Sequence, residues 1–147
     1  RALGSLWDEI AAYGERVFPR AGIHFADLHQ VLIAAARRDT PALRQRLAEL
    51  EARHAAGKLA PGSVMLDLCR GAEAFAAGRY EDAIRLLAPA LPEVSRVGGS
   101  HAQRELFEDT LIVACLRTGK REQARALIDG RLHRRPSSRD QAWRALA

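Results

Sequence analysis

Residues 74–87 read Ala-Phe-Ala-Ala-Gly-Arg-Tyr-Glu-Asp-Ala-Ile-Arg-Leu-Leu. One helical pattern ends in a short turn at Gly78, and the turn leads directly into an amphipathic helix. The arrangement recurs at Gly119, and it also occurs before Gly78, where Thr40 is a suitable N-cap and Pro41 occupies the first helical position. Three units of similar length therefore follow one another along the chain.

A further helical pattern precedes each of these three helices. Pairs of antiparallel helices that are joined by tight turns and repeated along a chain form an α-solenoid. We therefore predict an all-α fold, an α-solenoid with units of about 40 residues. The segment 89–99 is predicted to be a long loop. The predicted helices cover residues 5–17, 24–37, 41–56, 64–77, 80–88, 101–118, 122–134 and 138–146.

The composition favours the same fold class. Hydrophobic residues make up 48% of the 147 residues but aromatic residues only 5%, which favours helices over strands. A chain of this length suits a single domain, which we assign to residues 1–147. Because the chain begins at Arg1 without an initiator methionine, and its first helix has no partner before it, we expect the carboxy-terminal part of a longer protein.

Several functional classes find no support in the sequence. It contains no run of about 18 apolar residues and no signal-peptide pattern, so we expect a cytoplasmic protein without a membrane segment. Cys69 and Cys115 lie in Ala/Leu-rich helical patterns, which indicates buried, reduced thiols. The five histidines lack the spacing of a zinc helix, and phosphate-loop and nucleophile motifs are absent. We therefore expect no metal and no cofactor, and we do not favour an enzyme.

The spacing of Gly71, Gly78, Tyr80, Ala83 and Ala90 resembles the tetratricopeptide repeat. In that repeat, small residues let two helices approach each other and the tyrosine packs across the turn. The units here are longer than the usual length of about 34 residues.

A closer resemblance rests on two stretches, FADLHQVLIAAARRD (25–39) and GGSHAQRELFEDTLIVACLRTGKREQARALI (98–128). Both are similar to the carboxy-terminal region of the tetratricopeptide repeat protein 38 family, and the resemblance covers nearly the whole chain. It implies a tetratricopeptide-like fold. It implies no activity or ligand for any residue here.

The start of the second stretch places four polar residues in the first turns of a helix. Ser100 followed by Gln103 fits the capping box, in which the two side chains bond reciprocally to each other's backbone amides. Capping does not account for His101 and Arg104. We predict that these two side chains tie the 89–99 loop to neighbouring helices, through Asp67 or Glu108.

Acidic residues recur with the units, since Asp27, Asp67 and Glu108 follow one another at intervals of about 40 residues. A solenoid would stack them into a polar seam that could bind a partner. Alternatively, these carboxylates bond to neighbouring helix starts or to arginines, as is common between repeats, and we favour this second interpretation. The candidate partner-binding residues are Asp27, His29, Asp67, Arg70, Glu73, His101, Arg104 and Glu108.

These observations favour an interaction module that binds a protein or peptide partner on the concave face of the superhelix. The alternative is a small-ligand or hydrolytic site formed by Asp27, His29, His101 and Arg104. That alternative requires side chains of the first and third units to meet in one pocket.

The net charge of +5 is concentrated at the carboxy-terminal end. From Arg117 onward there are nine basic and three acidic residues, a net charge of +6, whereas the preceding residues carry −1. This segment lacks the interleaved aromatic residues that stack on bases, and it matches no nucleic-acid motif. We expect a solvated outer face without a specific nucleic-acid partner.

Overall fold

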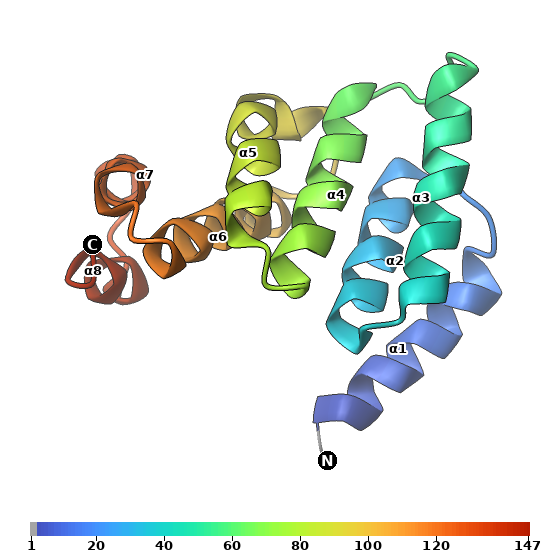
Figure 1. The fold of residues 1–147 in the computed structure, drawn as a ribbon, viewed down its shortest axis with the longest axis horizontal. Coiled ribbons are helices and arrows are strands. Elements are labelled where there is room, and N and C mark those ends of the chain that lie inside the picture. The colour runs from blue at the N-terminus through green and yellow to red at the C-terminus, as the bar shows by residue number, and fades with distance from the viewer. Residues whose placement is uncertain (1–2) are drawn as a thin grey trace.

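The computed structural model describes residues 3–147, which form eight α-helices, one 3₁₀-helix and no strand (Figure 1). The prediction of an all-α fold is confirmed, and every predicted helix is present with ends within two residues of the predicted ones. The elements are α1 (Leu3–Val17), α2 (His24–Arg37), α3 (Thr40–Ala55), α4 (Ser63–Ala76), α5 (Tyr80–Ala90), η1 (Leu91–Val97), α6 (His101–Arg117), α7 (Arg121–Arg134) and α8 (Ser138–Arg144).

Each α-helix packs on the α-helix that follows it in the chain. In addition, α2 packs on α4 and α4 packs on α6, so these three helices form the interior of the row. Their apolar faces supply the centre of the core, where Met65, Leu68 and Cys69 of α4 are fully buried. The helices α1 and α8 lie at opposite ends of the molecule (Figure 1).

The three turns that the sequence repeats share one backbone geometry. Arg38, Gly78 and Gly119 all have positive φ angles, of 56°, 77° and 74°. The amide of the next residue in each turn donates to the carbonyl five residues before it, at 2.9 Å in all three cases. This is a common way to end a helix, and glycine suits it because it has no Cβ to clash. The interval of about 40 residues in the sequence is thus the interval between turns of the same backbone geometry.

The predicted N-cap of α3 is wrong. Thr40 is the first residue of the helix, and Asp39 caps it instead by accepting a hydrogen bond from the amide of Ala42 at 3.1 Å. A carboxylate at this position also interacts favourably with the positive end of the helix dipole.

The prediction of a loop over residues 89–99 is also wrong, because α5 continues to Ala90 and residues 91–97 form η1. Proline is tolerated in the first turn of a helix, where Pro92 lies. Leu91, Val94 and Val97 are three residues apart and pack on the core, which matches the three residues per turn of a 3₁₀-helix.

The close packing of α4 on α5 depends on a glycine. A Cβ at Gly71 would lie 2.5 Å from Cδ2 of Leu87, so a side chain at this position would require the buried Leu87 to move. The ring of Tyr80 packs edge-on against that of Phe75 at a centroid distance of 5.4 Å.

Both cysteines are buried free thiols, as predicted. Burial raises the pKa of the Cys69 thiol and raises that of Cys115 to about 11. Neither thiol is therefore ionised near neutral pH.

Candidate functional site

Asp27 is a buried structural acid. Its Oδ1 accepts a hydrogen bond from Arg46 of α3 at 3.0 Å, and its Oδ2 accepts one from the amide of Gly22 at 2.9 Å. Arg46 also donates to the carbonyl of Phe18 at 2.5 Å. The pair thus fastens the connection between α1 and α2 to α3, and both carboxylate oxygens are occupied.

His29 bonds within its own helix. Its Nδ1 lies 2.8 Å from the carbonyl oxygen of Phe25, and the two rings have centroids 4.2 Å apart. Phe25 also touches the start of α6, because a Cβ at Gly99 would lie 2.5 Å from its ring. The first helix pair therefore reaches the segment just before α6 through an apolar contact.

The candidate residues of α4 pair separately with basic or acidic neighbours. Arg70 pairs with Glu51 of α3 at 2.8 Å, and Glu73 pairs with Arg79 at 2.6 Å. Glu73 also lines a hollow of about 500 Å³ beside the turns of the first two helix pairs. The side chain of Asp67 forms no ion pair or hydrogen bond within residues 3–147. These side chains do not converge on one point.

The capping box at the start of α6 is present as predicted. The amide of Gln103 donates to Ser100 Oγ at 3.3 Å, and the amide of Ser100 donates to Gln103 Oε1 at 2.8 Å. Both bonds satisfy amides that a helix start leaves without an intrahelical partner.

The predicted partners of His101 and Arg104 are wrong. Arg104 donates to the carbonyl of Gly99, just beyond η1, and Nδ1 of His101 lies 3.5 Å from Glu105 one turn along α6. Both partners lie within five residues in the sequence. Residues this close along the chain can reach each other at a helix start, whereas contact with Asp67 would depend on how the helices pack. Arg104 still ties the 91–99 segment to α6, although through the backbone.

Three of the candidate residues line one groove between α5, η1, α6 and α7. His101, Arg104 and Glu108 project from α6 into this space of about 470 Å³. Asp27 and His29 do not line it, and they line neither the hollow beside the turns of the first two helix pairs nor the cavity between α1, α2 and α3. The apolar lining of the groove comes from Ala88, Leu91, Pro92, Val94, Leu111 and Leu127.

Ion pairs form one rim of this groove. Glu108 accepts hydrogen bonds from Arg134 of α7 at 3.2 and 3.3 Å, and Glu105 accepts one from Arg135 at 2.6 Å. The hydrogen bond from Arg135 lowers the pKa of Glu105 below its usual range, although burial opposes the shift. Glu105 is therefore ionised at neutral pH, and the groove combines apolar walls with fixed charges.

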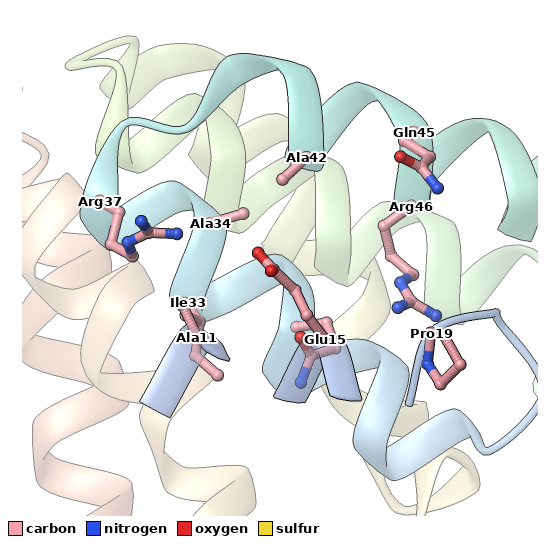
Figure 2. A pocket seen from close by; sticks show the side chains of 10 residues that line it. Ala11, Glu15, Pro19, Ile33, Ala34, Arg37, Ala42, Gln45 and Arg46 are labelled. Carbon is pink, nitrogen blue, oxygen red and sulfur yellow. The ribbon is translucent and has the colours of Figure 1, made fainter. Parts of the chain in front are cut away.

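A smaller cavity of about 190 Å³ lies between α1, α2 and α3 (Figure 2). Figure 2 shows Glu15, Arg37, Gln45 and Arg46 around it. Its arginines already have partners, since Arg37 pairs with Asp8 at 3.0 Å and Arg46 bonds to Asp27. The cavity is therefore a weaker candidate for an anionic ligand than its two arginines suggest.

Sequence reasoning missed the buried arginine of α7. Arg131 is almost fully buried and pairs with Asp109 of α6 and with the fully buried Asp140 of α8, the latter at 3.1 Å. Burial alone would lower the pKa of Arg131, but these acids, together with Glu108, raise it. The sequence signal was weak, because Arg131 stands among eight other basic residues of the same segment.

The basic segment is largely neutralised by acids of the same molecule. Six of its nine basic residues form ion pairs, most of them with carboxylates of α6, α7 and α8. The six are Lys120, Arg131, Arg134, Arg135, Arg139 and Arg144.

Residues 3–147 contain no group of three or more His, Cys, Asp or Glu side chains placed to hold a metal ion. None of the helices in this range is long and apolar enough to cross a membrane.

No known protein-family model matches this chain, and no solved structure matches it. The resemblance to the tetratricopeptide repeat protein 38 family stays a prediction.

Proposed function

We propose that this chain is a helical-repeat module that binds a peptide segment of a protein partner. The helix pairs α2–α3, α4–α5 and α6–α7 are the units of a tetratricopeptide-like α-solenoid. Two observations support this architecture: the identical turns at Arg38, Gly78 and Gly119, and the packing of α2 on α4 and of α4 on α6.

The observation that carries the proposal is the groove of about 470 Å³ between α5, η1, α6 and α7. Its volume lies within the range of ligand sites, which are apolar clefts with a few placed polar groups. The groove is partly open to solvent and not an enclosed cavity, so it suits a segment of chain better than an enclosed small molecule. Binding on the concave face stays a prediction, and the groove is a more specific candidate surface.

The lining indicates which peptide would fit. Leu91, Val94 and Leu127 offer an apolar contact for one or two aliphatic or aromatic side chains, which usually supply most of the binding energy. Glu105 and Arg134 at the rim can bond to polar groups of the same segment.

A library of random peptides displayed on phage, selected on the immobilised chain, tests this proposal. We expect selected peptides to carry apolar anchors, and their addition to shift amide resonances of η1, α6 and α7 in nitrogen-15 spectra. Failure to select any peptide above background, or shifts confined to other helices, would contradict the proposal.

Two equivalent leucines provide the matched variants. Leu127 lines the groove, whereas Leu86 lies one repeat earlier, at the corresponding place in α5, and does not line it. We expect Leu127→Gln to weaken binding of the selected peptides at least about tenfold, through loss of an apolar contact. Leu86→Gln should leave the affinity unchanged. Equal effects of both variants would indicate a general loss of stability, which melting curves of both proteins would reveal.

A further inference from the structure

The turn of the first helix pair holds an arginine where the other two turns hold glycine. Within residues 3–147, Arg38 is the only residue besides glycine with a positive φ angle, at φ 56° and ψ 32°. The corresponding residues of the later pairs are Gly78 and Gly119. An L-residue in this left-handed conformation is strained, and such strain is concentrated at functional positions. The geometry of the turn therefore does not explain why this position carries an arginine.

The same helix pair has a small residue where the other two have a large apolar one. Ala35 lies three positions before Arg38, and the corresponding residues are Phe75 and Leu116. In the second pair, the ring of Phe75 packs against that of Tyr80 across the turn. In the first pair, Ala35 instead lines the hollow of about 500 Å³.

This hollow lies between the turns of the first two helix pairs, α2–α3 and α4–α5 (Figure 1). Its apolar walls come from Ala35 and Leu43 of the first pair and from Ala76 and Ala77 near the end of α4. Its volume lies within the range of small-molecule sites, which combine apolar walls with a few polar groups. The hollow shares no lining residue with the groove between α5 and α7, so a ligand here would not depend on peptide binding.

Arg38 supplies the uncompensated charge of this hollow. Within residues 3–147, its exposed side chain forms no ion pair or hydrogen bond. The acids nearby are bonded to other arginines. Glu73, which lines the hollow, accepts a hydrogen bond from Arg79 at 2.6 Å. Asp39 accepts one from Arg37 at 3.2 Å. The hollow therefore offers a free guanidinium beside apolar walls.

We propose that this hollow, the Arg38 hollow, binds a small organic acid whose carboxylate bonds to the Arg38 guanidinium. The planar fork of an arginine donates two parallel hydrogen bonds to the two oxygens of a carboxylate. Thr40 and Tyr80 also line the hollow, and their hydroxyl groups are further donors. The apolar part of the acid lies against Ala35 and Leu43, where the first helix pair lacks the large side chain of the other two.

The charges favour a carboxylate over a phosphate ester. A phosphate monoester carries nearly two negative charges at neutral pH, and it would lie in the same hollow as the carboxylate of Glu73. A carboxylate requires only one opposite charge, and Arg38 supplies it. The ligand class is therefore a monocarboxylic acid with a short aliphatic or aromatic body.

Titrations followed by nuclear magnetic resonance test this assignment. The probes are hexanoate, phenylpropionate, the neutral amides of both acids, and phenyl phosphate, up to about 10 mM because fragments of this size bind weakly. We expect both carboxylates to shift the Nε–H resonance of Arg38 and the backbone amide of Gly78. The amides should bind at least about tenfold more weakly. Carboxylates that shift neither resonance, or amides that bind equally well, would overturn the proposal. Tighter binding of phenyl phosphate would overturn the choice of a carboxylate.

Two substitutions of Arg38 separate its charge from its backbone strain. Arg38→Gln keeps a side chain at the positive φ angle, and we expect it to weaken carboxylate binding at least about tenfold without changing the melting temperature. Arg38→Gly should lose binding equally but raise the melting temperature by about 2–4 °C, because glycine adopts this conformation without strain. The matched control is Arg44→Gln, since Arg44 is exposed and does not line the hollow. This control should bind as the natural chain does. Unchanged binding by Arg38→Gln would contradict the proposal.

A substitution that fills the hollow tests its location. Ala35→Phe introduces the side chain that the second helix pair has at this position, and it should abolish carboxylate binding although Arg38 is retained. Ala35→Ser leaves the space open and should retain binding. Circular dichroism shows whether both variants fold, and the exposed Arg38→Gln tests the same site if Ala35→Phe does not. A folded Ala35→Phe protein that binds hexanoate as tightly as the natural chain would exclude the Arg38 hollow as the site.

Discussion

At both ends of the molecule, a buried arginine of one helix bonds to an acid of the preceding helix. Arg46 of α3 bonds to Asp27 of α2, and Arg131 of α7 bonds to Asp109 of α6. The third partner differs. Arg46 reaches the backbone carbonyl of Phe18 at the end of α1, whereas Arg131 reaches the carboxylate of Asp140 on α8.

This difference accompanies a difference in the outer helices. At the carboxy-terminal end, α8 brings Asp140 into the interior, and Ala147 packs on the core. Arg139 covers the Trp143 ring at 4.8 Å. At the amino-terminal end, α1 packs through small residues and leaves its large apolar residues outside. The carboxy-terminal end thus exposes one large apolar side chain, Leu146, whereas several are exposed along α1.

The middle helix pair uses neither device. All four charged side chains that are buried among residues 3–147 belong to the two end pairs or to α8, and they are Asp27, Arg46, Arg131 and Asp140. Between α4 and α5 the contact is apolar, with Leu87 packed over Gly71. Buried charges therefore lie in the two outer helix pairs and in α8, whereas the middle pair packs through apolar side chains.

The largest expected effect is at the carboxy-terminal end. Arg131→Ala should lower the free energy of unfolding by about 3–5 kcal/mol, because the buried Asp140 loses its charge partner. Urea unfolding followed by circular dichroism measures this loss. Arg144→Ala serves as the control, because that arginine pairs with Asp129 on the surface and should leave the midpoint nearly unchanged. Equal midpoints for both variants would show that the cluster does not hold this end.

A smaller effect is expected at the amino-terminal end. Arg46→Ala should cost about 2–4 kcal/mol, because Asp27 keeps the hydrogen bond from the Gly22 amide after losing its charge partner. Arg46 holds the end of α1. In the variant, deuterium exchange should therefore accelerate more for amides of α1 than for amides of α6. Uniform acceleration across all helices would mean that Arg46 stabilises the whole fold and not this end.

Much of the fold could be predicted because its causes are local. The 3.6-residue periodicity and the glycines at positions 78 and 119 determine helices and turns within short windows. The error at residues 89–99 had a local cause as well. Pro89 and Pro92 suggest a loop, but the three-residue spacing of Leu91, Val94 and Val97 was the signal for η1.

The candidate site was less predictable, because its contacts join distant residues. The capping box joins Ser100 and Gln103, which are only three positions apart, and it was predicted correctly. Arginine partners were expected for the recurring acids, but nothing local identifies Arg46 as the partner of Asp27, 19 residues away. Arg131 has no equivalent in the other units, since Leu127 and not Arg131 corresponds to Arg46 in the repeat. A pattern search based on repeats therefore could not find it.

The two ends also differ in how their interior helices start, which gives a third prediction. Ser100 caps α6 through its side chain, whereas Ile23 at the same place before α2 makes no side-chain cap bond. Ser100→Ala should cost about 1 kcal/mol, and Ile23→Ser should stabilise the protein by a similar or smaller amount. Thermal unfolding of both variants measures the two changes. A loss for Ile23→Ser would mean that the exposed isoleucine contributes more by packing than a cap can supply.

The smallest expected effect distinguishes the two ends by their response to acid and salt. The hydrogen bond from the half-exposed Arg135 lowers the pKa of Glu105, while burial opposes the shift. At the other end, burial of Glu49 is outweighed by a hydrogen bond from the Ala21 amide at 2.7 Å and by Gln45 and Arg46, so its pKa is lowered too.

Both lowered pKa values have the same sign of effect on stability. An acid whose pKa is lower in the folded state stabilises the protein above the pKa of the unfolded chain, about 4.3 for glutamate. This contribution disappears as the pH falls through the folded value. The cause of each shift predicts a different salt dependence, because salt screens an exposed charge pair more than an amide hydrogen bond. We therefore expect about 1 M salt to return the pKa of Glu105 toward its ordinary value and to move that of Glu49 less. Carboxyl carbon-13 titrations at low and high salt measure both values, with Glu105→Gln and Glu49→Gln to assign the resonances. Equal shifts with salt would show that ion pairing, and not the Ala21 amide, holds Glu49 ionised.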